Sequence, residues 1–267
     1  MKKSVLNVSN LALLAMLLLA CLPPAVVLVY ALTERWDGLL PQGPTWRWLI
    51  EVAQDPRSQQ AVATTLWLSL QSALLAVLLG GAASVMAYLS APKHPGLLRL
   101  LDLLALLPFA IPPVVLAINA LELFVGRWGA YLNLPVVYVL LVTPLLFPLV
   151  HKTLIAALQQ LDAAALLEAG RTLGASDGYL LRRVLLPLLA PALVAALLLS
   201  WTGAAMEFAI ANLLLGGSVE LLQPLLNSMR GVNGHQSAAL IVLSFAVVML
   251  LGLVVQGMSW KSKTKKN

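Results

Sequence analysis

The chain has 267 residues, of which 60% are hydrophobic and 10% are charged, whereas a soluble domain contains about 25% charged residues. This composition excludes an ordinary soluble enzyme, because one core of this length cannot bury so much apolar surface, and lipid has to cover the remainder. One cysteine and three dispersed histidines indicate no internal disulfide, no metal site and no other cofactor. The formal charge of +6 lies at the ends of apolar segments, as membrane topology requires, and indicates no nucleic-acid partner.

Six apolar segments are long enough to cross a bilayer, since a helix needs about 20 apolar residues to span a hydrocarbon core about 30 Å thick. They are residues 11–32, 62–90, 97–124, 134–155, 185–215 and 237–258. The first segment passes Cys21 in a pattern that resembles a lipoprotein signal, but its apolar run continues to Leu32 and favours an uncleaved span. The sequence thus predicts an all-α polytopic membrane protein with six transmembrane helices.

The basic residues predict the orientation of these spans. With the N-terminus inside, five of the 17 lysines and arginines face outward, and the other 12 face the cytoplasm; the five are Arg35, Arg47, Arg57, Arg127 and Arg230. The positive-inside rule therefore places both termini in the cytoplasm of a bacterium, with the spans in its inner membrane. The expected regions are an N-terminal tail with the first span (1–32), a periplasmic loop (33–61), a five-span core (62–258) and a basic cytoplasmic tail (259–267). The periplasmic loop is either a connector or a binding surface.

Residues 156–184, between the fourth and fifth spans, have the pattern of two short cytoplasmic helices joined by a glycine turn. Asp162 is placed to cap the first helix and Ser176 to cap the second. Gly174 stands where a left-handed residue would end the first helix, and Pro187 marks the start of the fifth span. Small side chains expose the backbone of this helix pair to close approach, which indicates a docking surface.

The residues of this segment resemble the EAA loop of permease subunits from binding-protein-dependent ABC importers. The resemblance is carried by Glu168-Ala169-Gly170-Arg171-Thr172-Leu173-Gly174-Ala175-Ser176, followed by Arg182-Arg183-Val184-Leu185-Leu186-Pro187. The sequence departs from the family pattern at Gly170, where a second alanine is more usual, and at the acidic Asp177. The six-span core of the family matches nearly the whole chain.

In such permeases the two short helices are coupling helices that fit a groove in an ATPase. The resemblance implies that ATP-binding cassette ATPase subunits are contacted or positioned through Glu168, Ala169, Gly170, Gly174, Ala175, Leu186 and Pro187. It also implies a second permease subunit, identical or different, and a periplasmic substrate-binding protein as partners. The alternative interpretation is an amphipathic helix pair that rests on membrane lipid.

The resemblance extends to two places within the spans. Pro112 and Pro113 resemble a proline-rich stretch in the third span of the family, and proline kinks a helix, which would serve a gate or only bend the span. Glu207 and Phe208 resemble the Glu-Phe of a small-Gly-Glu-Phe pattern in the fifth span, with Met206 in place of the glycine. An intramembrane carboxylate is costly unless it faces protein or water, so Glu207 is expected either on the translocation path or as a structural hydrogen-bond acceptor.

Four further polar positions remain within the spans. Asn119 and Asn212 are candidates for the path and, more readily, for hydrogen bonds between helices. His151 stands at a span end, where it is read as part of the topology. Asp102 is expected near the cytoplasmic interface, with solvent or Arg99 as its neighbour and no assigned role.

The sequence holds no glycine-rich loop ending in Gly-Lys-Ser/Thr, so the chain is expected to take its energy from a separate ATPase and not to be an enzyme. The predicted function is one half of the translocation path of an ATP-driven importer. The resemblance is greatest to permeases for polyamines, ferric iron, thiamine and 2-aminoethylphosphonate, and 2-aminoethylphosphonate is favoured as the substrate. The alternative function is an ion-coupled secondary transporter, which would normally show inverted repeats and several intramembrane charges.

Overall fold

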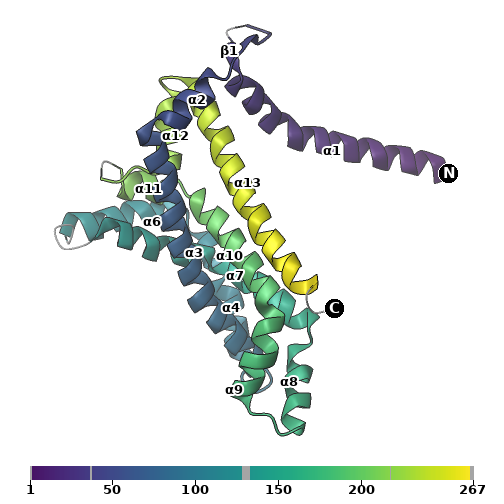
Figure 1. Cartoon of the computed structure of the whole chain (residues 1–267). Coiled ribbons are helices and arrows are strands. Elements are labelled where there is room, and N and C mark those ends of the chain that lie inside the picture. The colour runs from purple at the N-terminus through teal and green to yellow at the C-terminus, as the bar shows by residue number, and fades with distance from the viewer. Residues whose placement is uncertain (1, 37, 128–132, 217, 265–267) are drawn as a thin grey trace. The chain divides into compact units, whose positions relative to one another are not determined.

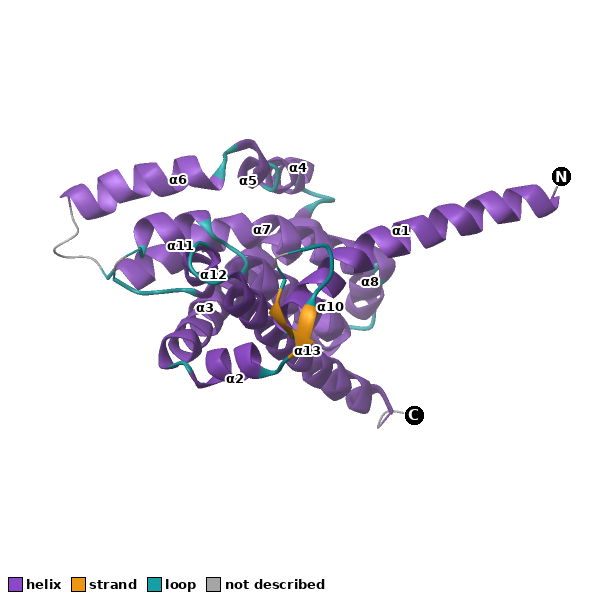
Figure 2. Cartoon of the chain, turned by 90° about the horizontal axis from the view of Figure 1, so that it is seen from above, coloured by secondary structure: helices purple, strands orange, loops and turns teal. Residues whose placement is uncertain are grey.

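The structure is a computed structural model that describes residues 2–36, 38–127, 133–216 and 218–264. Within these ranges the regular secondary structure is helical apart from one two-stranded sheet, with loops between the elements (Figure 2). It divides into two compact units, one of residues 1–60 with 225–250 and the other of residues 61–224 with 251–267.

The first unit begins with α1 (Lys2–Ala31), whose apolar stretch Asn10–Ala31 is long enough to cross a membrane, as predicted. None of the most apolar part of this stretch is buried within the chain, so lipid or another subunit has to cover it. The loop that follows forms an antiparallel hairpin of β1 (Thr33–Arg35) and β2 (Gln42–Pro44), in which Thr33 pairs with Pro44. It continues into α2 (Arg47–Gln54).

Three more helices among the described residues have the length and apolarity of a membrane span. They are α3 (Pro56–Ser90), α7 (Leu134–Gln160) and the continuous helix Asp177–Ala205. In the second unit, α7 packs most extensively against the last part of that helix, α10 (Leu186–Ala205) (Figure 1). The core of this unit includes Val142, Leu146 and Val150 on α7 and Ala204 on α10.

The third predicted span is broken into α4 (Pro95–Leu104), α5 (Leu107–Ala110), α6 (Pro113–Ala120) and the π-helix η1 (Leu121–Arg127). Its two halves meet at an angle of 83°. The bend follows from Pro112 and Pro113, which donate no backbone hydrogen bond, and from Ile111, which is extended as residues before proline usually are. The predicted kink in this span is confirmed.

The fifth span is shorter than predicted. The predicted segment of residues 185–215 is not a single helix, because α10 ends at Ala205 and a separate helix, α11 (Ala209–Leu214), follows. Before α10 come α9 (Asp177–Leu180) and the π-helix η2 (Leu181–Leu185), so the second short helix expected on the cytoplasmic side runs directly into the fifth span.

The last two helices are α12 (Leu222–Arg230) and α13 (Gly234–Thr264). The described apolar part of α13, Gly234–Leu250, is shorter than the other spans. The described residues therefore contain four helices able to cross a membrane, or five with the bent pair, and the six predicted spans are not all established. The basic tail predicted for residues 259–267 lies outside the part of the chain whose side chains are described.

Candidate functional site

The segment between α7 and α10, together with the first two residues of α10, contains the residues that the sequence analysis assigned to coupling. Its first helix, α8 (Ala163–Thr172), ends in a Schellman motif. The Ala175 amide donates to the Gly170 carbonyl at 3.1 Å, and the Gly174 amide donates to the Arg171 carbonyl at 2.9 Å. Gly174 has φ 83°, so the predicted left-handed end of this helix is confirmed.

The two predicted caps occupy the right positions but work differently. Asp162 precedes α8 in a left-handed conformation with φ 45°, and Ser176 precedes α9 in an extended one. Neither side chain makes a capping hydrogen bond. Asp162 therefore contributes through its backbone, because aspartate tolerates a left-handed conformation better than most residues do.

We refer to residues 161–187 as the coupling segment. Its inner face is buried against the ends of two spans. Leu167 of α8 and Leu180 of α9 pack with Leu158 of α7, and Ala175 lies partly buried against the same cluster. A Cβ atom built on Gly170 would overlap Leu180 Cδ2 and lie 3.0 Å from Cδ1. Glycine replaces the family's alanine here at a position where a methyl group would require the buried Leu180 side chain to shift.

The outer face of the coupling segment is exposed. Glu168 and Ala169 are exposed on α8, and Leu173 at the turn is 88% exposed. Tyr179 on α9 is 59% exposed. The sequence analysis did not select Leu173 or Tyr179; an apolar residue directly before the glycine of a helix turn was the available signal for Leu173.

An ion pair closes the turn of this segment. Arg171 Nε donates to Asp177 Oδ1 at 2.6 Å, and both side chains are exposed. Asp177, which departs from the family pattern, therefore already has a basic partner within the chain. Leu186 and Pro187 are exposed at the start of α10, where Pro187 follows the π-helical turn η2.

The residues assigned to the translocation path lie on α6, on α11 and at the break before α11. Glu207 occupies the break, and its two carboxylate oxygens accept the amide protons of Ile210 and Ala211, each at 2.9 Å. The carboxylate thus satisfies the first free amides of α11, which is the capping role. Phe208 beside it is 40% exposed.

Helices α6 and α11 pack against each other, so the candidate path residues come together at one end of the second unit, and the coupling segment lies at the other (Figure 1). Pro112 and Pro113 stand at the start of α6. Asn119 is exposed, and its amide donates to the Val115 carbonyl of its own helix at 2.8 Å. Asn212 is exposed on α11.

A polar network in the spans was missed by sequence reasoning. His151 is fully buried, and its Nδ1 lies 2.8 Å from Ser84 Oγ on α3. Its Nε2 lies 3.3 Å from Asp102 Oδ1 on α4, which also accepts from Lys152 Nζ at 2.7 Å. Asp102 therefore pairs with α7 instead of the expected Arg99, while its side chain stays 45% exposed, in line with the expected contact with solvent. The available signal for this network was that Ser84, Asp102 and His151 stand at a similar depth in three predicted spans.

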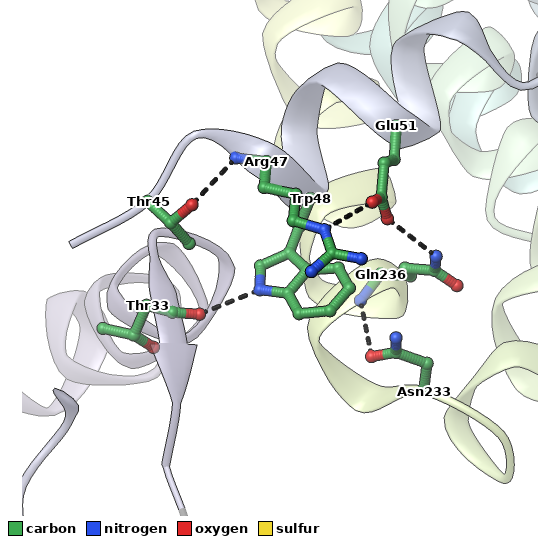
Figure 3. A network of polar contacts seen from close by, with 7 residues as sticks. All are labelled: Thr33, Thr45, Arg47, Trp48, Glu51, Asn233 and Gln236. Carbon is green, nitrogen blue, oxygen red and sulfur yellow. Dashed lines mark hydrogen bonds and ion pairs between the residues drawn. The ribbon is translucent and has the colours of Figure 1, made fainter. Parts of the chain in front are cut away.

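The loop of residues 33–61 is a folded structure (Figure 3). Trp48 Nε1 donates to the Thr33 carbonyl at 2.9 Å, and Arg47 and Gln236 both donate to the carboxylate of Glu51, at 2.6 and 3.2 Å. These two donors hold the pKa of Glu51 below its usual value. In the same unit, the His235 ring stacks between Tyr30 and Trp48, with ring centroids 4.0 and 5.5 Å away.

Comparisons with known proteins agree with this architecture. Residues 80–260 match the family described as binding-protein-dependent transport system inner membrane component. The spermidine/putrescine transport system permease protein PotC of Haemophilus influenzae is 27% identical over 88% of this chain and 91% of its own length. A probable sulfate transport system permease protein, cysT of Nephroselmis olivacea, is 31% identical over 77% of this chain and 75% of its own length.

One further relative and one solved structure are also similar to this chain. A putative 2-aminoethylphosphonate transport system permease protein, PhnV of Salmonella paratyphi A, is 30% identical over 67% of this chain and 66% of its own length. The fold is similar to a chain of the methionine ABC transporter MetNI in an inward-facing conformation, with a TM-score of 0.60 and 19% identity, over 76% of this chain and 94% of that chain. The chain therefore belongs to the family of inner membrane components of binding-protein-dependent transport systems, and is an ABC importer permease subunit rather than an enzyme.

Proposed function

We propose that the chain forms one half of the translocation path of an ATP-driven importer, and that its coupling segment docks a separate ATPase. The observation that supports docking is Leu173, which is 88% exposed at the tip of a turn whose inner face is buried. A single exposed leucine is ordinary on a protein surface, but Leu173 stands within the segment that resembles the coupling helices of the family, and Tyr179 of the same segment is 59% exposed. With both termini cytoplasmic, as the basic residues predict, this turn is on the side of the membrane where ATP is available.

The seven coupling residues divide into two roles in this proposal. Glu168 and Ala169 are exposed beside Leu173 and contact the ATPase, Glu168 by pairing with a basic group. The other five give the surface its shape: Gly170 and Gly174 allow the tight turn, Ala175 packs beneath it, and Leu186 and Pro187 connect it to α10.

The partners follow from the family and its relatives. The relatives are permease proteins of transport systems, and the solved structure of similar fold is from an ABC transporter. We therefore infer ATPase subunits, a second permease subunit and a periplasmic substrate-binding protein as partners. The second permease is either another copy of this chain or a different one.

The substrate in this proposal is a small charged solute, with polyamines and 2-aminoethylphosphonate as the leading candidates, because relatives named for both match most of the chain. Glu207 is engaged by the amides of α11, which favours a role at the break of the fifth span over direct binding of a substrate amine. Family membership gives the ion-coupled alternative no support.

Co-purification from native membranes tests the docking of the ATPase. The variants to compare with wild type are Leu173→Asp, at the tip, and Gly174→Asp, at the turn. Val232→Asp is the matched control, because Val232 is 90% exposed in the loop between α12 and α13. ATPase subunits, identified by mass spectrometry, are expected with wild type and the control and absent from both turn variants.

The same eluate identifies the second permease, or shows that this chain pairs with itself. ATPase retention by Leu173→Asp at the wild-type level would contradict docking at this turn. A wild-type protein that recovers no ATPase, under conditions that preserve other transporter complexes, would contradict the proposal as a whole.

A further inference from the structure

Four side chains on three helices form a polar cluster that the transport function described above does not use. The cluster consists of Ser84 on α3, Asp102 on α4, and His151 and Lys152 on α7, and we refer to it as the polar clasp. The imidazole of His151 is at its centre, 2.8 Å from Ser84 Oγ and 3.3 Å from Asp102 Oδ1.

The order Ser, His, Asp is that of a hydrolase triad, but the geometry excludes this chemistry. Ser84 is fully buried, so no substrate reaches its hydroxyl. The same hydroxyl donates to the Gly80 carbonyl at 2.6 Å. The clasp is therefore a structural connection between helices.

The clasp joins α7 to α3 and α4 in two different ways. Helix α3 is held to α7 by close packing, since a Cβ on Gly80 would lie 2.8 Å from Phe147 and one on Gly81 would lie 3.2 Å from Leu154. The Phe147 ring also stacks on His151, with centroids 5.2 Å apart. These contacts enclose the imidazole between α3 and α7.

Helix α4 depends on the clasp to a greater extent. None of its ten residues, all of them described, is buried. Asp102 is its polar connection to α7, through a hydrogen bond to His151 and an ion pair with Lys152 whose Nζ lies 2.7 Å from the carboxylate. Without this carboxylate, the position of α4 would depend on its C-terminal end, where Ala105 is buried and α5 contacts α7.

The clasp lies close along the chain to α8 and to the bend of the third span. Helix α7 ends at Gln160, and α8 begins only three residues later at Ala163. Helix α4 leads within a few residues to the 83° bend of the third span. The clasp therefore lies between the segment that leads to α8 and the segment that leads to the bend.

We propose that Asp102, held by His151 and Lys152, is a positioning residue that makes α4 move together with α7 when the ATPase displaces the coupling segment. This inference rests on the proposed docking of the ATPase. In this proposal, the clasp transmits the movement of the coupling segment to the third span.

Spin-label distances test the proposal in the purified complex. Labels at Arg99→Cys on α4 and Gln159→Cys on α7, both exposed positions, are introduced into a Cys21→Ser background because Cys21 is exposed. Pulsed electron paramagnetic resonance is recorded at rest and after trapping with ATP and vanadate. Wild type is expected to give one narrow distance that is the same in both states, since α4 follows α7.

Asp102→Ala is expected to broaden this distance at rest and to shift it on trapping. The charge exchange Asp102→Lys with Lys152→Asp restores the ion pair and is expected to restore the narrow distance, which a general loss of folding would not do. Thr153→Val is the matched control, because this hydroxyl donates to the Leu149 carbonyl of its own helix at 2.7 Å. It is expected to behave as wild type.

A wild-type distance that changes on trapping would overturn the proposal, as would an unchanged narrow distance in Asp102→Ala. If Asp102→Ala does not fold, Asp102→Asn, which keeps a hydrogen-bond acceptor but loses the charge, is measured in its place and is expected to give a broadened distance. A complex that retains no ATPase contradicts the proposed function, but the comparison of wild type and Asp102→Ala at rest still decides whether the clasp positions α4.

Discussion

Asp162 and Gly174 bracket α8 with left-handed backbone conformations, with φ 45° at Asp162 and 83° at Gly174. A residue with a Cβ atom loses about 1 kcal/mol or more in this conformation, whereas glycine does not. These two residues set the directions in which the chain reaches and leaves α8, and they thereby hold Leu173 at the exposed tip.

Replacing Gly174 with alanine is expected to destabilise this turn by about 1 kcal/mol, because alanine has to adopt the left-handed conformation. Amide hydrogen exchange of residues 163–180 measures the effect, which corresponds to about fivefold faster exchange where local opening exposes the amides. The structure leaves open space around a Cβ at this position, so the backbone conformation alone accounts for the loss.

Gly178→Ala is the matched control for that experiment. Gly178 lies within α9, and a Cβ there also meets open space. Alanine is favoured over glycine inside a helix by about 1 kcal/mol, so exchange in the same segment is expected to slow. Equal effects of the two substitutions would contradict a turn that depends on the left-handed Gly174.

Gly170 and Leu180 are expected to be energetically coupled. Alanine at position 170 gains about 1 kcal/mol of helix propensity, but its methyl group overlaps Leu180, which is buried. Gly170→Ala is therefore expected to be neutral or destabilising in wild type. In a Leu180→Ala background the overlap is gone, and the same substitution is expected to stabilise the segment.

A double-mutant cycle on thermal unfolding of the purified protein measures this coupling. The expected interaction is about 1 kcal/mol or more, within the range found for contacting residues. Additive effects of the two substitutions would show that the close approach of α8 and α9 imposes no restriction at Gly170.

The sequence predicted those features that depend on local composition. The spans α1, α3 and α7 follow from apolar length, and the bend in the third span and the left-handed Gly174 follow from residue types with restricted or special backbone geometry. Features that depend on distant neighbours were not predictable in this way. Gly170 is explained by Leu180 across the turn, and His151 by Ser84 and Asp102 on two other helices.

The break in the fifth span shows the limit of hydropathy as a guide. The apolar run from residue 185 to residue 215 is interrupted by one carboxylate, which a windowed average hides. The carboxylate of Glu207 makes the break possible because it accepts two amides of the helix that follows. The sequence marks Glu207 as a single acid within an apolar run. It does not show that the partners of this acid are backbone amides three and four residues further along the chain.

Glu207→Ala is expected to loosen α11. Its carboxylate accepts the amide protons of Ile210 and Ala211 at 2.9 Å, and a hydrogen bond to a charged group contributes a net stabilisation of about 1.5–3 kcal/mol. Amide exchange at these two residues in lipid nanodiscs is expected to accelerate more than tenfold. Unchanged exchange would show that the carboxylate does not hold the helix.

Glu207→Gln separates capping from a role on the translocation path. Glutamine keeps one side-chain oxygen as an acceptor and loses the charge, so α11 is expected to stay largely protected from exchange. Uptake of spermidine, putrescine and 2-aminoethylphosphonate is measured in the same variant, in cells that depend on this permease. Reduced uptake with a protected α11 assigns the charge to the path, and full uptake assigns Glu207 to capping alone.

Asp55 caps the start of α3, and its contribution to stability is expected to be lost at acid pH. Its carboxylate accepts the Ser58 hydroxyl at 2.6 Å, the Ser58 amide at 2.9 Å and the Arg57 amide at 3.3 Å. These bonds, led by the Ser58 hydroxyl and opposed by partial burial, lower the pKa of Asp55. A carboxylate with a lowered pKa contributes stability above its unfolded pKa of about 3.9, and this contribution is lost as the pH falls through the folded value.

The difference in thermal midpoint between wild type and Asp55→Ala measures this contribution. Removal of an N-cap aspartate costs about 1 kcal/mol, so wild type is expected to be the more stable protein by that amount at pH 7 and still at pH 5. Below pH 4 the difference is expected to shrink, because protonated Asp55 loses its charge-assisted bonds to Ser58. Other carboxylates titrate in both proteins and cancel in the comparison. A difference that stays constant down to pH 3 would show that the ionised carboxylate does not cap α3.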